Sequence, residues 1–141
     1  DMPLLRREVY EGLLNCHRQT QAACTFLTGT SELSLPYGRI LRDGAGEFVR
    51  VVEDKDCTPE QKQIRELNVG IYCFDGHLLS GALDRLNNDN AQHEYYLTDV
   101  PEILRQDGGK ISLYQGQLGE QIIGVNTPDQ LALTEQYLRQ R

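Results

Sequence analysis

The amino-acid sequence predicts an α/β protein with a mixed sheet, because helical and strand-like segments alternate along its 141 residues. Apolar residues recur at helical spacing near the start of the chain and again near its end. Between these segments lie short runs rich in β-branched and aromatic residues, bounded by Gly, Asn and Pro, which are typical of strands. A chain of this length is expected to form one domain that buries a core without disulfides.

The first half of the chain is predicted to contain one long helix followed by three strands. The segment PLLRREVYEGLLNCHRQ (3–19) carries Leu5 and Leu13 on one helical face. Asp1 and Pro3 stand where the cap and first turn of this helix would be. The strand-like runs are ACTFLTGT (23–30), RILRD (39–43) and EFVRVVED (47–54), the last two joined by a hairpin turn at GAG.

The second half continues the alternation of helices and strands. TPEQKQIREL (58–67) predicts a short helix, because Thr58 can cap it and Pro59 fits its first position. NVGIYCF (68–74) is the most strand-like segment of the chain. The remaining elements are helices over 77–86, 98–106 and 127–140 and a strand over 110–116.

Charge and composition exclude several classes of partner. The chain has 14 Lys+Arg against 21 Asp+Glu, a net charge of −7, which argues against a general nucleic-acid-binding or anionic-membrane surface but leaves room for a local basic pocket. It contains no apolar run near the ~18 residues of a membrane span. The four cysteines form no CxxC pair, so they are expected to be buried reduced thiols in a cytoplasmic protein.

Each polar motif has an ordinary structural explanation when it is taken singly. Asp1, Thr98 and Asn126 can serve as helix caps or turn residues. Gly38 can be a turn glycine, and the acidic run that begins at Glu53 can be a solvated edge. The combination of motifs is what favours a functional site.

Five motifs occur in one order: YGRI, VEDKDCT, NVGIY, NNDNAQHEYYLTD and GVNT. In this order and spacing the chain resembles the sugar-nucleotide pyrophosphorylase family over essentially its whole length. Within that family it is most similar to the uridyltransferase domains of bifunctional bacterial enzymes that make UDP-N-acetylglucosamine. The resemblance implies a Rossmann-like nucleotidyltransferase (nucleotide-diphospho-sugar transferase) fold.

The resemblance also implies a reaction and a set of site residues. Such domains join UTP and N-acetylglucosamine 1-phosphate into UDP-N-acetylglucosamine with release of pyrophosphate, supplying cell-envelope synthesis. Asp1 and Asn126 match the positions that hold Mg²⁺. The positions that match the sugar-binding residues are Gly38, Glu53, Asn68, Tyr96, Thr98 and Asn126.

The stretch EYYLTD would then be both a helix start and a wall of the sugar site. Tyr96 and Thr98 lie two residues apart, so an extended segment aims both side chains the same way. Tyr95 is expected to point inward as core. Two positions depart from the family pattern: His93 stands where Gly is usual, and Val69 where Thr is common.

The sequence shows no match to the family's glycine-rich triphosphate loop. We therefore expect a partial fold, a fragment that lacks the N-terminal nucleotide-binding half and is inactive alone. We also expect this chain to self-associate through an exposed sheet edge. Two other hypotheses stay open: a non-catalytic sugar-phosphate-binding or regulatory module, and a stable structural fragment that binds nothing measurable.

Overall fold

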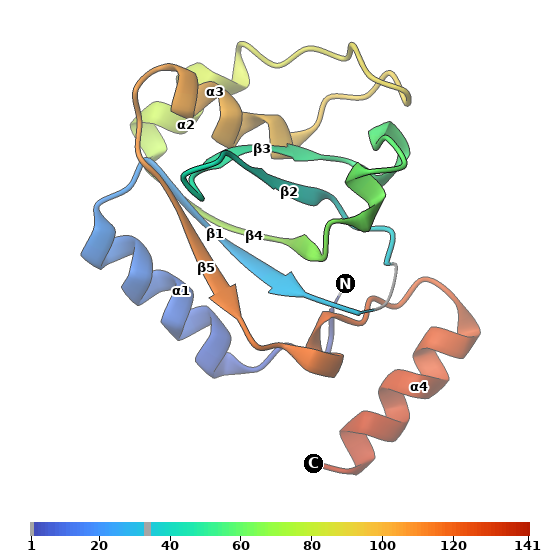
Figure 1. Ribbon diagram of the computed structural model, residues 1–141. Coiled ribbons are helices and arrows are strands. Elements are labelled where there is room, and N and C mark those ends of the chain that lie inside the picture. The colour runs from blue at the N-terminus through green and yellow to red at the C-terminus, as the bar shows by residue number, and fades with distance from the viewer. Residues whose placement is uncertain (1, 33–34) are drawn as a thin grey trace.

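The computed structural model describes residues 2–32 and 35–141 and is built around a five-stranded mixed sheet (Figure 1). The strand order is β3-β2-β4-β1-β5, and only β1 and β5 are parallel among the described pairs. The strands are β1 (Cys24–Thr30), β2 (Arg39–Arg42), β3 (Phe48–Val52), β4 (Glu66–Phe74) and β5 (Ile111–Gly116). The predicted α/β class with a mixed sheet is confirmed.

Helices cover both faces of this sheet. Figure 1 shows α1 on one side and α2 with α3 on the other, while α4 stands apart beyond the end of β5. The helices are α1 (Arg7–Thr20), α2 (Gly76–Leu83), α3 (Val100–Gln106) and α4 (Pro128–Arg139). Short 3-10 turns occur at η1 (Asp54–Asp56), η2 (Gln61–Gln63), η3 (Leu97–Asp99) and η4 (Gly119–Ile122).

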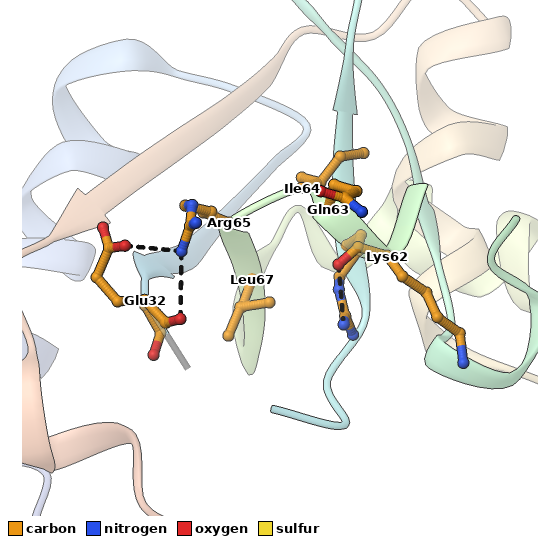
Figure 2. Close-up of a pocket in the computed structure, with 8 residues that line it drawn as sticks. Glu32, Lys62, Gln63, Ile64, Arg65 and Leu67 are labelled. Carbon is orange, nitrogen blue, oxygen red and sulfur yellow. Dashed lines mark hydrogen bonds and ion pairs between the residues drawn. The ribbon is translucent and has the colours of Figure 1, made fainter. Parts of the chain in front are cut away.

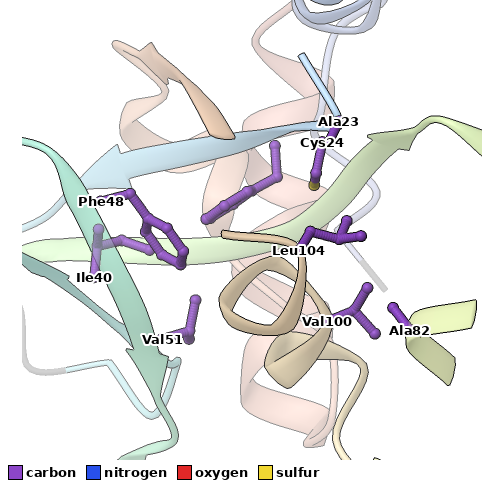
Figure 3. Close-up of a cluster of buried hydrophobic side chains, with 9 residues drawn as sticks. Ala23, Cys24, Ile40, Phe48, Val51, Ala82, Val100 and Leu104 are labelled. Atoms are coloured by element: carbon purple, nitrogen blue, oxygen red, sulfur yellow. The ribbon is translucent and has the colours of Figure 1, made fainter. Parts of the chain in front are cut away.

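The two faces of the sheet bury two separate apolar clusters. One cluster packs the sheet against α2 and α3, with Phe26 and Phe48 in edge-to-face contact and Val100 and Leu104 supplied by α3 (Figure 3). The other cluster packs Leu13 of α1 against the opposite face. Strand β4 contributes side chains to both clusters, because successive side chains of a strand point to opposite faces of the sheet.

The N-terminal helix begins later than the sequence predicts. It starts at Arg7 rather than at residue 3, with Arg6 in an extended conformation at its N-cap. Pro3 lies in a turn before the helix, so its predicted place in the first helical turn is wrong. Leu4 is fully buried, and its carbonyl accepts a hydrogen bond from Arg141 at 2.6 Å. Tertiary packing of this segment therefore replaces the first predicted turn.

The helix predicted over 58–67 is also wrong. Thr58 and Gln61 do form the reciprocal cap expected of a helix start, but the helical conformation ends after the single 3-10 turn η2. Ile64 is extended, and Leu67 pairs with Gly29 of β1 and Arg39 of β2. A helix cap contributes about 1 kcal/mol of stability. Burial and strand pairing of Leu67 in the sheet outweigh this contribution, so the segment does not continue as a helix.

The other predicted elements are present, with ends shifted by a few residues. The GAG turn closes the β2–β3 hairpin, where Gly46 has a φ of +81° and Asp43 accepts backbone N–H bonds from Ala45 and Glu47. All four cysteines are free, but only Cys24 is fully buried. Within residues 2–32 and 35–141, no helix is long and apolar enough to span a bilayer.

Candidate functional site

Gly38 and Asn68 meet where β2 begins beside β4. The backbone N–H of Asn68 donates to the carbonyl of Gly38 at 2.8 Å. A Cβ at residue 38 would stand 2.7 Å from a methyl of Val51 and 3.6 Å from a carboxylate oxygen of Glu53. Glycine is therefore required by close packing here, and this packing brings the residue-38 backbone up against Glu53.

Glu53 and Thr98 form the second contact of the site. The Thr98 hydroxyl donates to Glu53 Oε1 at 2.6 Å, joining the end of β3 to the turn η3, which lies 45 residues further along the chain. A hydroxyl–carboxylate bond of this length is charge-assisted and stronger than a neutral one. Thr98 therefore helps to fix the orientation of the Glu53 carboxylate.

Tyr96 lines a cavity of about 210 Å³ beside this pair, whose walls include Glu53, Asp56, Asn90 and Asp99. Its hydroxyl is buried, and its contact with the side chain of Gln92 does not reach hydrogen-bond geometry. Tyr96 is extended, but Thr98 lies in the 3-10 turn η3, so the prediction of one extended segment that aims both side chains the same way is wrong. The expectation that Tyr95 is core is wrong: its side chain is 66% exposed, because the segment lies at the surface with no layer behind it.

The Asn68 side chain is held by its own strand. Its Nδ2 donates to the hydroxyl of Tyr72 at 2.8 Å, and its Oδ1 accepts from the backbone N–H of Gly70 at 3.1 Å. Asn68 is 7% exposed, so each of these bonds satisfies a buried polar group. The amide therefore points along one face of β4 in a fixed orientation.

The acidic run around Glu53 is not a solvated edge. Asp54 pairs with the guanidinium of Arg39 at 2.9 Å, and Arg39 is 1% exposed. Arg39 also donates to the carbonyls of Leu35 and Tyr37, so it fastens the segment before Gly38 to the turn after Glu53. The expectation of a solvated edge is therefore wrong for Asp54.

Asp56 ties down the loop that precedes Tyr96. Its Oδ1 accepts from the backbone N–H of Ala91 at 2.8 Å. Within that loop, Asn90 accepts from the N–H groups of Gln92 and Glu94 and donates to the carbonyl of Glu94. His93 follows with a φ of +53°, a left-handed conformation that glycine adopts at less cost. The departure from Gly noted in the sequence therefore falls on a strained position.

Acidic side chains outnumber basic ones in the lining of the cavity, with Glu53, Asp56, Asp89 and Asp99 against Arg50. Burial raises the pKa of the Asp99 carboxyl, and repulsion from Glu102 and Glu53 raises it further, while Arg50 opposes the shift. A cavity with such walls favours ligand groups that donate hydrogen bonds, such as sugar hydroxyls, over phosphate oxygens. Sequence reasoning missed Asp99 as a lining residue, although it stands in the quoted EYYLTD motif.

Asn126 lies on an exposed turn just before α4. Its backbone N–H donates to Gln130 Oε1 at 2.7 Å, within the capping box that Thr127 and Gln130 form. Among the described residues no hydrogen bond joins Asn126 to Glu53, Asn68 or Thr98. Asp1, its expected partner in holding Mg²⁺, lies outside the described residues, and the described part of the chain contains no cluster of three or more acidic, His or Cys side chains that could hold a metal.

A second hollow, of about 290 Å³, lies beside the cluster but shares little with it. Figure 2 shows Arg65, paired with Glu32, on one side of Leu67, and Lys62 and Gln63 on the other side. None of the residues predicted to bind the sugar or the metal lines this hollow. We assign it no role.

The fold and the cluster define an α/β domain with a mixed sheet and a small polar pocket at one end of β2 and β3, in agreement with the nucleotidyltransferase fold predicted from the sequence. The chain is homologous along its whole length to bacterial proteins named bifunctional protein GlmU. It is 43% identical to the protein of Geobacillus thermodenitrificans, 45% to that of Brevibacillus brevis and 42% to that of Bacillus subtilis.

Each of these matches covers 100% of this chain but 31% of the relative, so the chain spans about a third of the length of the curated proteins it resembles. No family model matches the chain. The family recognised from the five sequence motifs is confirmed by these relatives.

Proposed function

We propose that this chain is the sugar-binding part of an N-acetylglucosamine-1-phosphate uridyltransferase, which joins UTP and N-acetylglucosamine 1-phosphate into UDP-N-acetylglucosamine and pyrophosphate. The observation that carries the proposal is the assembly of Gly38, Glu53, Asn68 and Thr98 by direct contacts beside the cavity lined by Tyr96. These contacts join segments far apart in a sequence that is homologous throughout to the GlmU proteins. The activity itself is proposed for the complete protein that carries this chain.

The chemistry of the cluster suits an N-acetylated sugar ring. Glu53 supplies a carboxylate that accepts from hydroxyls, and the Asn68 amide keeps one N–H and one lone pair for a ligand after its internal bonds are made. Gly38 is buried, and because it has no Cβ its backbone packs against Val51 beside the Glu53 carboxylate. Acidic walls around Asp99 favour the ring in the cavity, with the phosphate directed away from it.

Mg²⁺ is the proposed cofactor, and Asp1 and Asn126 are the residues proposed to hold it. Carboxylate and amide oxygens are the hard donors this ion prefers, and the exposed Asn126 side chain makes no hydrogen bond within the described structure. When bound, the ion would neutralise charge on the phosphoryl oxygens. The sugar cluster would orient the phosphate of N-acetylglucosamine 1-phosphate toward the nucleotide.

One alternative is a non-catalytic sugar-phosphate-binding module. The observation that favours it is the asymmetry of the site: the sugar cluster is assembled within the described residues, whereas the exposed Asn126 makes no hydrogen bond to that cluster there. The two functions differ in turnover, because a binding module would hold the sugar phosphate without producing pyrophosphate.

The test is pyrophosphate release by the complete protein with UTP, N-acetylglucosamine 1-phosphate and Mg²⁺, run beside calorimetric titration of the sugar phosphate. Turnover at an ordinary enzymatic rate of about 1–10³ s⁻¹ supports the uridyltransferase. Binding without turnover supports the module instead. If the complete protein neither binds the sugar phosphate nor releases pyrophosphate, both proposals are contradicted.

We further propose that the 141-residue chain self-associates through β4. Within the described residues β4 pairs with β2 only at Leu67, so on the side away from β1 the stretch from Val69 to Phe74 has no partner strand. Unpaired strand edges are templates for pairing with another chain. Sedimentation velocity should show a mass that rises with concentration, whereas a monomer at every concentration would contradict the proposal.

A further inference from the structure

Tyr72 occupies the same face of β4 as Asn68, four residues further along the strand. Its hydroxyl accepts a hydrogen bond from Asn68 Nδ2 at 2.8 Å. Tyr72 ends the NVGIY motif, but the sequence assigned it no role, because an aromatic residue in a buried strand is ordinarily read as core. Its hydroxyl, however, lies against a residue proposed to contact the sugar.

The orientation of the Asn68 amide follows from its two partners. The backbone N–H of Gly70 can only donate, so the atom that faces it must be the amide oxygen. The NH₂ group is thereby turned toward Tyr72. Gly70 can make this contact because its φ is +90°, at a place where the pairing of β1 with β4 is irregular between Phe26 and Thr28.

Tyr72 is itself held firmly. Its ring is stacked on Phe74 with centroids 5.3 Å apart and lies 5.5 Å from the ring of Phe26. Burial raises the pKa of the Tyr72 phenol, the bond from Asn68 lowers it, and the nearby charges of Glu53 and Asp99 raise it again. The hydroxyl is therefore neutral at physiological pH, and it receives the Asn68 N–H as an oxygen acceptor while keeping a proton of its own.

We propose that Tyr72 is a positioning residue for sugar recognition: its hydroxyl fixes the Asn68 amide, so that the remaining N–H and lone pair of Asn68 face the ligand. The inference rests on the proposed uridyltransferase function. Without the hydroxyl, Asn68 keeps the bond from Gly70 but loses the acceptor that holds its NH₂ group. The amide then reorients at a cost that the bound sugar must offset.

The test is a double-mutant cycle in the complete protein with Tyr72→Phe and Asn68→Ala, singly and together. Tyr72→Phe keeps the ring packing and removes only the hydroxyl. The KM for N-acetylglucosamine 1-phosphate should rise about two- to tenfold, the effect of one net hydrogen bond, while the KM for UTP stays unchanged. In the Asn68→Ala background Tyr72→Phe should have no further effect on the sugar KM.

Tyr114→Phe is the matched control, because Tyr114 is a tyrosine of the same sheet that packs in the opposite cluster. It should leave both Michaelis constants unchanged. The proposal is overturned if Tyr72→Phe leaves the sugar KM unchanged in an active enzyme, if both Michaelis constants rise together with a falling melting temperature, or if the two substitutions are additive. A wild-type protein without turnover would instead overturn the uridyltransferase function, and this inference with it.

Discussion

The Glu53–Thr98 end of the sheet and the Asn126 turn are proposed to belong to one site, yet the structure holds them very differently. Gly38, Glu53, Asn68 and Thr98 lie in direct contact and are braced by the buried Arg39. Asn126 is exposed and followed by α4, a helix with few contacts to the rest of the fold and with Leu131 and Leu138 open to solvent.

This difference separates two ways of preparing a site. Side chains locked by packing and hydrogen bonds need little reordering when a ligand binds, so they favour affinity and specificity. A residue on an exposed turn can be placed by a ligand or by other parts of a protein, at an entropic cost on binding. We therefore expect substitutions in the first region to change stability and sugar affinity together, and Asn126 to affect activity alone.

The largest effect is expected at Arg39. Arg39→Met removes one partner of a buried pair and leaves Asp54 and the carbonyls of Leu35 and Tyr37 without their donor, so the free energy of unfolding should fall by about 3 kcal/mol. Urea unfolding of this chain measures the change. Arg7→Met is the control, because the Arg7–Glu11 pair is exposed and should cost at most about 0.5 kcal/mol. Equal costs would show that Arg39 does not brace the cluster.

The next effect concerns sugar affinity in the complete protein. Asn68→Ala leaves the Gly70 N–H and the Tyr72 hydroxyl unpaired and removes a proposed sugar contact, at about 1–3 kcal/mol or up to ~100-fold in affinity. Titration calorimetry with N-acetylglucosamine 1-phosphate measures it. Asn88→Ala, at an exposed asparagine of the NNDN stretch, should leave affinity unchanged. A reversed order would mean that the family roles do not transfer to this chain.

Asn126→Ala sharpens the contrast between the two regions. The complete protein should lose roughly 10- to 100-fold in turnover at low Mg²⁺ and recover part of it at high Mg²⁺, as expected when a metal contact is removed. Because Asn126 is exposed, the free energy of unfolding should change by no more than about 0.5 kcal/mol. Gln130→Ala, which breaks the neighbouring capping box, is expected to lower stability without a change in Mg²⁺ dependence. A loss of turnover that Mg²⁺ does not relieve would contradict a metal role for Asn126.

The smallest effect is expected at His93, in the loop that carries Tyr96. His93→Gly relieves a left-handed conformation at φ +53° but makes the unfolded chain more flexible, so the net gain should be about 0.5 kcal/mol. His77→Gly, at an exposed position in the first turn of α2, should have the opposite sign. Thermal unfolding of both variants measures the difference, and a loss of stability on His93→Gly would show that its side chain stabilises the loop.

The sequence by itself determined the α/β class, most of the helices and strands, and the motifs that point to the family. These features are local: the β-branched and aromatic composition of β1 and β4, the Thr127–Gln130 capping box and the turn chemistry of the β2–β3 hairpin all depend on neighbouring residues. Local chemistry gave a wrong prediction at 58–67. The cap of a helix start is present there, but the residues that follow it pair with β1 as the start of β4.

Only the tertiary structure decided which polar residues meet. Glu53 and Thr98 lie 45 residues apart and Asp56 and Ala91 lie 35 apart, so no local pattern joins them. The role of Arg39 also depends on burial. The sequence shows only a charged residue in a short strand, whereas in the fold its side chain is fully buried and braces the cluster. The tertiary structure also leaves Tyr95 exposed to solvent and makes the Tyr72 hydroxyl the hydrogen-bond acceptor of Asn68. The environment of a side chain depends on which distant segments pack over it, and not only on its neighbours in the chain.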